Sequence, residues 1–306
     1  MKTISKGNIF LILAAVVWGM GLVSQQAGMD YLGPLSFTAV RCTLGGVSMI
    51  PLVMFLSKGK KQAAGRTSTE DKQAASKTET LKAAFFCALP LVSLILLQQY
   101  GLLHTTVGKA GFITALYILI TPVSGKFLLK KPVARNTWVG VAIALVGMYF
   151  LCLTGGIDGI NIGDVIMIFA AFASATHMHV VDHFVAKHDP VKLSCYQFIM
   201  VGLMCLIPAF IFESDVFTWE YIKLSAVPIL YAGLASCAVG YTFQVIGQKY
   251  TEPNTASLLL SMETVFALLT GWIILGEVLA KVEYLGCVIM FIAIIIAQIP
   301  DKKYKD

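Results

Sequence analysis

The sequence predicts an all-α integral membrane protein with ten transmembrane helices, arranged as two inverted five-helix repeats. Hydrophobic residues make up 57% of the 306-residue chain and charged residues only 13%, far from the composition of a soluble domain. Apolar runs repeatedly reach about 20 residues, the length that crosses a bilayer. The expected membrane segments are 7–28, 33–57, 82–104, 107–130, 135–154, 162–186, 191–212, 222–247, 253–276 and 282–300.

Basic residues gather in every second connection between these segments, mainly in residues 58–82 and 126–135. With a cytoplasmic amino terminus, these connections lie inside, while Lys109, Lys223 and Lys281 lie outside. The positive-inside rule requires this bias. We therefore expect both termini in the cytoplasm of a bacterial cell, with the chain in its plasma (inner) membrane. The net charge of +6 then reports orientation and does not indicate binding to nucleic acid.

Little of the chain is left for a soluble domain. Residues 57–81 are polar without apolar periodicity and are expected to form a cytoplasmic linker, and residues 301–306 a cytoplasmic tail. The seven cysteines occur singly in apolar segments, without a CxxC pair. We therefore expect the cysteines to be small core residues that form no disulfide and bind no metal or cofactor.

The two halves of the chain, 1–154 and 160–300, share motifs. Residues 110–123 (AGFITALYILITPV) are similar to residues 256–265 (ASLLLSMETV) at comparable places in each half. Because five helices per half is an odd number, the second half enters the membrane from the opposite side. An inverted repeat of this kind places a binding site near the middle of the membrane, between the halves.

Two motifs in the second half, Gln248–Pro253 (QKYTEP) and Met262–Ala267 (METVFA), resemble the last repeat of EamA-type transporters in the drug/metabolite transporter (DMT) superfamily. The opening Trp18-Gly19 and Gly33-Pro34 resemble the first repeat, so the resemblance spans nearly the whole chain. It implies a secondary transporter for amino acids and related metabolites, commonly exported.

The halves differ at one position of this pattern. In the family the fourth helix of a repeat often has a central proline, preceded in the second repeat by glutamate. Here the first repeat keeps Pro122 without the acid, and the second keeps Glu263 with Thr264 in the proline's place. Pro122 is expected to kink its helix and act in gating, whereas Thr264 is expected to leave its helix straighter.

Glu263 lies near the middle of an apolar helix. An ionised carboxylate there costs roughly 2.5 to 3.5 kcal/mol if it faces lipid. We therefore expect Glu263 to face a central cavity, where it binds a cationic group of the substrate or carries a coupling proton. The alternative is a carboxyl group that only holds helices together.

Arg41 lies about eight residues below the expected outer surface. We expect it to face the same cavity and to pair with backbone carbonyls, with a substrate carboxylate or, through water, with Glu263. The alternative is that its long side chain reaches outward to the membrane surface.

Other polar side chains recur at helical spacing on several segments, for example Thr114, Tyr117, Thr121 and Ser124. Such faces must turn away from lipid. The alternative for each residue is adhesion between helices. The predicted substrate-binding residues of this kind are Trp18, Gln25, Gln98, Gln99, Tyr117, Thr121, Tyr241 and Gln244.

Histidines occur on the segment 162–186. His177 is a candidate proton carrier, because imidazole titrates near neutral pH, or a core histidine bonded to a neighbouring helix. His179 and His183 have the i, i+4 spacing of metal ligands, with Asp182 between them. We favour a solvated helix end over a metal site for this group.

These features favour a secondary transporter, an exporter or exchanger, with alternating access around a cavity in the middle of the membrane. No P-loop is present, so transport is expected to use a gradient or exchange. Uptake of a vitamin-like or other metabolite is the alternative, and a membrane-embedded enzyme or a channel is less favoured. The expected partners are a small molecule, protons and the lipid bilayer, with the chain acting as a monomer or homodimer.

Overall fold

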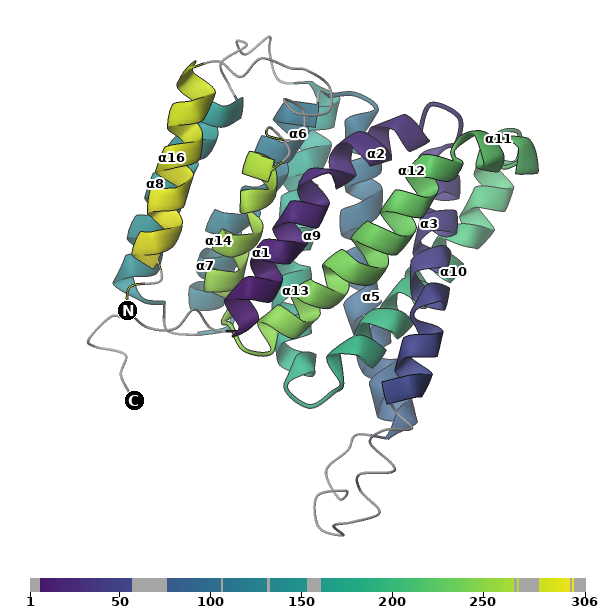
Figure 1. Cartoon of the computed structure of the whole chain (residues 1–306), viewed down its shortest axis with the longest axis horizontal. Helices are drawn as coiled ribbons and strands as arrows, with labels where there is room; N and C mark the ends of the chain where they lie inside the picture. The colour runs from purple at the N-terminus through teal and green to yellow at the C-terminus, as the bar shows by residue number, and fades with distance from the viewer. Residues whose placement is uncertain are drawn as a thin grey trace.

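The structure is a computed structural model. It describes residues 6–56, 76–105, 107–130, 133–152, 161–266, 269, 281–297 and 299. These residues form helices joined by short turns, with no strand among them. Most of the helices run across the molecule in roughly the same direction and pack side by side (Figure 1).

The helices, with their bounds, are α1 (Lys6–Gly19), α2 (Gly21–Gly28), α3 (Pro34–Ser48), α5 (Lys77–Leu102), α6 (Val107–Thr114), α7 (Tyr117–Phe127), α8 (Arg135–Cys152), α9 (Ile162–Val185), α10 (Pro190–Phe212), α11 (Trp219–Leu224), α12 (Ala226–Leu230), η2 (Tyr231–Gly240), α13 (Tyr241–Gln248), α14 (Pro253–Leu260) and α16 (Lys281–Ala297). The element η2 is a π-helix.

Within the described residues, six helical stretches are long and apolar enough to cross a membrane. They are Lys6–Gly28, Pro34–Leu56, Lys77–Leu102, Ile162–Val185, Pro190–Phe212 and Ala226–Gln248. Their outer faces carry exposed apolar side chains such as Phe55, Phe169 and Ile207, as expected of helices that face lipid. The prediction of an all-helical membrane protein is confirmed. The end of the ninth expected segment, residues 270–276, and the tail 301–306 lie outside the described residues.

The start of α5 corrects one predicted boundary. Ser76 and Glu79 form a capping box, in which the Glu79 N–H donates to Ser76 Oγ (3.1 Å) and the Ser76 N–H donates to Glu79 Oε2 (2.7 Å). This reciprocal cap starts the helix at Lys77. The last residues of the predicted linker 57–81 are therefore helical, and residues 57–75 lie outside the described part of the chain.

The helix that carries Glu263 is broken, against the prediction that Thr264 would leave it straighter. α14 ends at Leu260, and a turn at Ser261 precedes the next helical residues. Ser257 Oγ donates to Asn254 O (2.8 Å) and Ser261 Oγ donates to Leu258 O (2.7 Å). Serine hydroxyls that bond nearby backbone carbonyls compete with regular helix. The break thus occurs without proline, where two serines make such bonds.

The corresponding helix of the first half is broken between α6 and α7. The Leu116 N–H donates to Ile113 O (3.1 Å) and the Leu119 N–H to Leu116 O (2.9 Å), the tighter pattern of a 3₁₀ turn. Pro122 lies further along, inside α7. Its missing N–H leaves the carbonyl of Ile118 without its usual helical partner.

Two apolar clusters make up most of the core. One joins α1, α7, α9 and α14 through residues such as Leu11, Ile118 and Leu259. The other joins α3, α5, α9 and α10 through residues such as Leu91 and Phe198. Helix α9 belongs to both clusters, so it links the two parts of the bundle.

Candidate functional site

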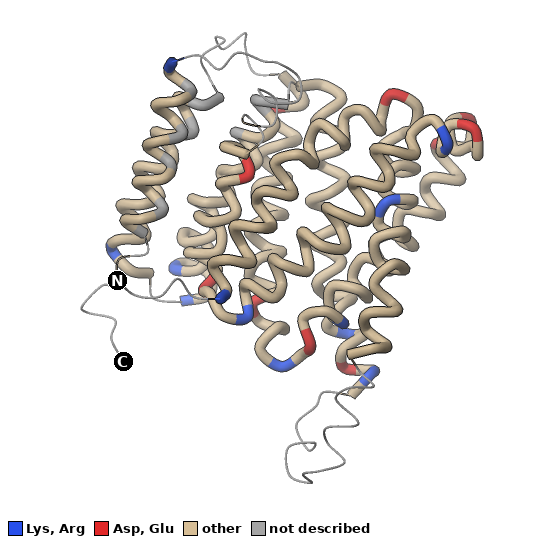
Figure 2. The backbone as a smooth tube through the Cα atoms, viewed as in Figure 1, with Lys and Arg blue, Asp and Glu red and all other residues tan. Residues whose placement is uncertain are grey.

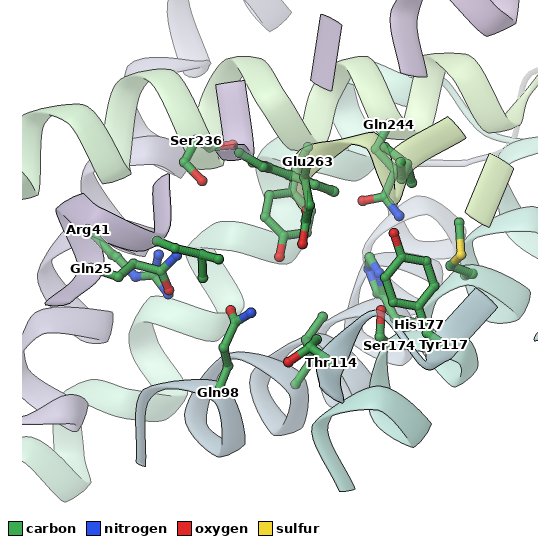
Figure 3. Close-up of a pocket in the computed structure, with 16 residues that line it drawn as sticks. Gln25, Arg41, Gln98, Thr114, Tyr117, Ser174, His177, Ser236, Gln244 and Glu263 are labelled. Atoms are coloured by element: carbon green, nitrogen blue, oxygen red, sulfur yellow. Dashed lines mark hydrogen bonds between the residues drawn. The ribbon is translucent and has the colours of Figure 1, made fainter. Parts of the chain in front are cut away.

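A polar cavity lies inside the bundle, lined by residues from both halves of the described chain (Figure 3). Its free volume is about 50 Å³, enough for roughly three to five water molecules. A larger solute therefore requires the surrounding helices to move. The lining residues are Trp18, Leu22, Gln25, Arg41, Leu94, Gln98, Thr114, Tyr117, Ser174, His177, Met178, Ser236, Tyr241, Gln244, Leu260 and Glu263.

Arg41 supplies positive charge to this cavity. The side chain is only 2% exposed, and its Nε has no hydrogen-bond partner. The guanidinium carbon lies 5.4 Å from the centre of the Phe37 ring, within range of a cation–π contact. Figure 3 shows Gln25 beside it, and the buried Gln25 Oε1 also lacks a partner. Because a buried cation is costly without a partner, this end of the cavity is suited to an anionic group.

Glu263 supplies negative charge. It is 8% exposed and follows the break at Ser261 by two residues. Figure 3 shows it between the end of the cavity that holds Arg41 and the end that holds Gln244, Tyr117 and His177. No hydrogen bond or ion pair to its carboxylate occurs within the described residues. The cavity therefore contains one group of each charge, and the two are not paired with each other.

Aromatic rings form one wall. The rings of Trp18 and Tyr241 lie 4.4 Å apart, and the Phe198 ring lies edge-on to Tyr241 at 4.9 Å. Trp18 Nε1–H donates to Ser236 O at 3.4 Å, which fixes the indole. Such a wall offers a rigid apolar surface beside the charged groups.

His177 closes the same wall. It is 1% exposed, and its ring lies 6.2 Å from that of Tyr241, nearly edge-on. Its Nε2 lies 3.3 Å from Gln197 Oε1 on α10. His177 thus has both features that the sequence left open, a bond to a neighbouring helix and a position on the cavity. Gln197 is fully buried and could not be recognised from the sequence, because it is a single amide in a mostly apolar helix.

The π-helix η2 leads into this wall. It spans Tyr231–Gly240 and ends directly before Tyr241. A π-helix is wider than an α-helix and is frequently found at functional sites. It places Ser236 on the cavity. Cys237 packs closely against Gly45 of α3, because a Cβ atom added at Gly45 would lie only 2.7 Å from the Cys237 Cβ. Neither η2 nor Ser236 follows from the spacing of apolar residues.

Most of the predicted binding residues line the cavity, but two do not, and the predicted gating residue Pro122 also lies outside the lining. Gln99 is fully buried outside the lining, with both amide atoms unpartnered, because it lies one position round the helix from Gln98. Thr121 Oγ1 donates to Tyr117 O (2.7 Å), and Thr121 also lies outside the lining. The lining includes the other predicted residues: Trp18, Gln25, Arg41, Gln98, Tyr117, His177, Tyr241, Gln244 and Glu263.

The histidines near the end of α9 do not gather around a metal position. His179 Nε2 lies 3.0 Å from Ser124 Oγ and 3.1 Å from Thr121 O on α7. His183 is exposed and lies edge-on to Phe184 at 4.9 Å. Within the described residues, no group of three or more histidine, cysteine or acidic side chains is placed to hold a metal ion.

Apolar spanning helices around an enclosed, charged cavity define a class, the helical membrane transporters. The model of the EamA-like transporter family matches residues 5–153 and again residues 161–298. The chain therefore belongs to the EamA-like transporter family. It is a membrane-embedded transporter of the EamA and DMT kind, and membership implies a small-molecule substrate.

Individual proteins agree with this assignment. An uncharacterized transporter of Archaeoglobus fulgidus is 26% identical over 95% of this chain and 85% of its own length. A probable amino-acid metabolite efflux pump of Salmonella typhimurium is 22% identical over 93% of this chain and 92% of its own. A protein crystal structure shares the fold, with a TM-score of 0.74 at 14% identity over 97% of both chains.

Proposed function

We propose that the chain is a secondary active transporter that exports or exchanges small zwitterionic metabolites such as amino acids. The observation that carries this proposal is the pair of buried, opposite charges, Arg41 and Glu263, in one cavity. Arg41 binds the substrate carboxylate, since a guanidinium matches a carboxylate in two hydrogen bonds. Glu263 binds the ammonium group, and the wall of Trp18 and Tyr241 contacts the apolar side chain. The name of the Salmonella relative supports the same substrate class.

The proposed topology has ten helices in two inverted repeats, residues 1–154 and 160–300, with both termini in the cytoplasm of a bacterial cell. The double match to the family model supports two repeats. The two helix breaks support them too, because Tyr117 and Glu263 each follow a break closely and both line the cavity. Figure 2 shows most basic residues at one end of the bundle, the end that we assign to the cytoplasm.

The small size of the cavity supports alternating access. Its free volume of about 50 Å³ is too small for an amino acid, so this conformation lies between the states that open to either side. The breaks at Ala115–Leu116 and Ser261 lie next to the cavity and are the proposed hinges. The chain acts as a monomer or homodimer.

Glu263 is also the proposed carrier of a coupling proton. A carboxylate in a nearly closed cavity can be neutralised by a substrate ammonium group or by a proton, and either allows the site to reorient without an unpaired charge. Competition between the two at one carboxylate couples substrate movement to the proton gradient. Uptake would use the same cavity in the opposite direction.

The test uses purified protein in liposomes. Wild type is expected to exchange radiolabelled amino acid across the membrane and to accumulate it when a pH gradient is applied. Glu263→Gln should exchange substrate more weakly and fail to accumulate it. Glu220→Gln, on the short helix α11 away from the cavity, is the matched control and should behave as wild type. Accumulation by Glu263→Gln equal to wild type would exclude coupling through this residue.

A further inference from the structure

A second feature lies outside the transport cavity, at the beginning of α5. A groove of about 720 Å³ runs between α5 and the end of α9 with the connection that follows it. A neighbouring groove of about 580 Å³ shares Lys82 and Phe86 with it and extends along α5. The first groove is lined by Glu79, Lys82, Ala83, Phe86, Phe184, Ala186, Lys187 and His188.

The outer part of this groove is basic. Lys82 approaches it from α5 and Lys187 from the turn that follows α9, and both side chains are exposed. The one acidic residue, Glu79, accepts the Ser76 N–H in the capping box, next to the positive end of the α5 dipole. His188 Nδ1 lies 3.2 Å from Thr80 Oγ1 and links the connection after α9 to α5. The two lysines are therefore placed to bind one anionic group between them.

The inner part is aromatic. Phe86 is 53% exposed, and its ring stacks on that of Phe184 with the centroids 6.1 Å apart and the planes 13° apart. Phe85, 42% exposed, continues the apolar surface in the neighbouring groove. Phe86 lies one helical turn further into the membrane-spanning stretch than Lys82. A molecule that fills the groove thus needs an anionic head at the membrane surface and an apolar chain that runs into the bilayer.

We propose that this groove binds an anionic phospholipid, with its phosphate between Lys82 and Lys187 and an acyl chain along Phe86 and Phe184. Basic pockets between helices at the basic side of a membrane protein have the chemistry of such sites. The start of α5, which borders the groove, lies at the end of the bundle where most of the coloured basic residues gather (Figures 1 and 2). Its exposed aromatic floor lets a lipid enter sideways from the bilayer.

The bound lipid bridges α5 and α9, the helices that carry Gln98 and His177 on the cavity. Filling the groove should therefore stabilise the folded protein, because a ligand that binds only the folded state raises its melting temperature. The transport cavity is a separate site, so this stabilisation does not depend on the identity of the transported substrate.

The experiment measures the melting temperature in neutral detergent while phosphatidylglycerol or phosphatidylcholine is added at equal concentration. Phosphatidylglycerol is expected to raise the melting temperature of wild type by several degrees and phosphatidylcholine by much less. The double variant Lys82→Gln/Lys187→Gln should lose this difference. The control Lys192→Gln/Lys249→Gln removes the same charge at the same end of the bundle, outside the groove, and should keep it.

Three results would overturn the proposal. Equal stabilisation by the two lipids would show that the headgroup charge is irrelevant. Retention of the difference by Lys82→Gln/Lys187→Gln would place anionic lipid elsewhere. An equal shift with inorganic phosphate alone would assign the groove to a free anion. Phe86→Ala tests the apolar part, and it should weaken stabilisation by long-chain phosphatidylglycerol while leaving a short-chain analogue unaffected.

Discussion

The two broken helices reach the same cavity by different means. Between α6 and α7 the backbone makes a 3₁₀ turn ahead of Pro122, whereas α14 ends where Ser257 and Ser261 bond nearby carbonyls. A residue just beyond each break lines the cavity, Tyr117 in one case and Glu263 in the other. The backbone geometry is thus similar in the two halves, but the chemistry is not. Beyond its break, one half offers a neutral phenol and the other a carboxylate.

The largest expected effect separates these two side chains. Glu263→Gln removes a charged partner worth about 1.5 to 3 kcal/mol, whereas Tyr117→Phe removes a neutral hydrogen bond worth about 0.5 to 1.5 kcal/mol. The substrate concentration that gives half-maximal exchange should therefore rise roughly tenfold to a hundredfold in Glu263→Gln and roughly twofold to tenfold in Tyr117→Phe. Equal effects of the two variants would mean that the two halves contribute equally to substrate binding, which would contradict the difference between Glu263 and Tyr117.

The second prediction concerns the break itself. In Ser257→Ala/Ser261→Ala the competing hydroxyl bonds are lost and helix propensity rises, so the melting temperature should increase by about 2 to 4 °C. Exchange should fall by roughly threefold or more, because a hinge beside the cavity becomes stiffer. Pro122→Ala should act in the same direction.

Ser93→Ala is the matched control for this variant. Ser93 Oγ makes a similar bond to Leu89 O (3.0 Å), but within the unbroken helix α5. Its removal should leave exchange unchanged. If Ser257→Ala/Ser261→Ala is more stable and exchanges substrate at the wild-type rate, the break is not a hinge.

The smallest expected effect is at His188, outside the membrane-spanning segments. Burial lowers the pKa of His188 below its ordinary value of 6.5, and nearby Lys187 lowers it further while Glu79 opposes this. The folded state thus takes up a proton less readily than the unfolded chain. The stabilisation that the neutral His188 ring gives the folded state is complete above pH 6.5 and is lost as the pH falls below that value. Between pH 7.5 and 5.5, the melting temperature of wild type should fall more than that of His188→Asn. An equal fall in both would contradict this origin.

Much of the fold could be predicted from the sequence, because lipid forces apolar runs into helices and polar faces inward. The same rule placed Arg41 and Glu263 on the cavity. Breaks within helices could not be predicted so well, because serine-to-carbonyl bonds leave no trace in hydrophobic periodicity. Thr264 was therefore misinterpreted.

Gln99 and Gln197 show a second limit. Spacing alone does not tell which of two adjacent amides faces a cavity, since neighbouring residues point about 100° apart round a helix. Gln98 lines the cavity, whereas Gln99 is buried between helices. Gln197 depends on the packing of α10 against α9, which a single helix cannot reveal.

We propose above that Arg41 and Glu263 bind opposite ends of one zwitterion. The most direct measurement is the melting temperature of wild type, Arg41→Gln and Glu263→Gln with an amino acid, with its decarboxylated amine and with its deaminated acid. The amino acid should stabilise wild type most. Arg41→Gln should lose the response to the acid and keep that to the amine, and Glu263→Gln should do the reverse. If both variants lose or keep the two responses together, the charges do not divide the substrate between them.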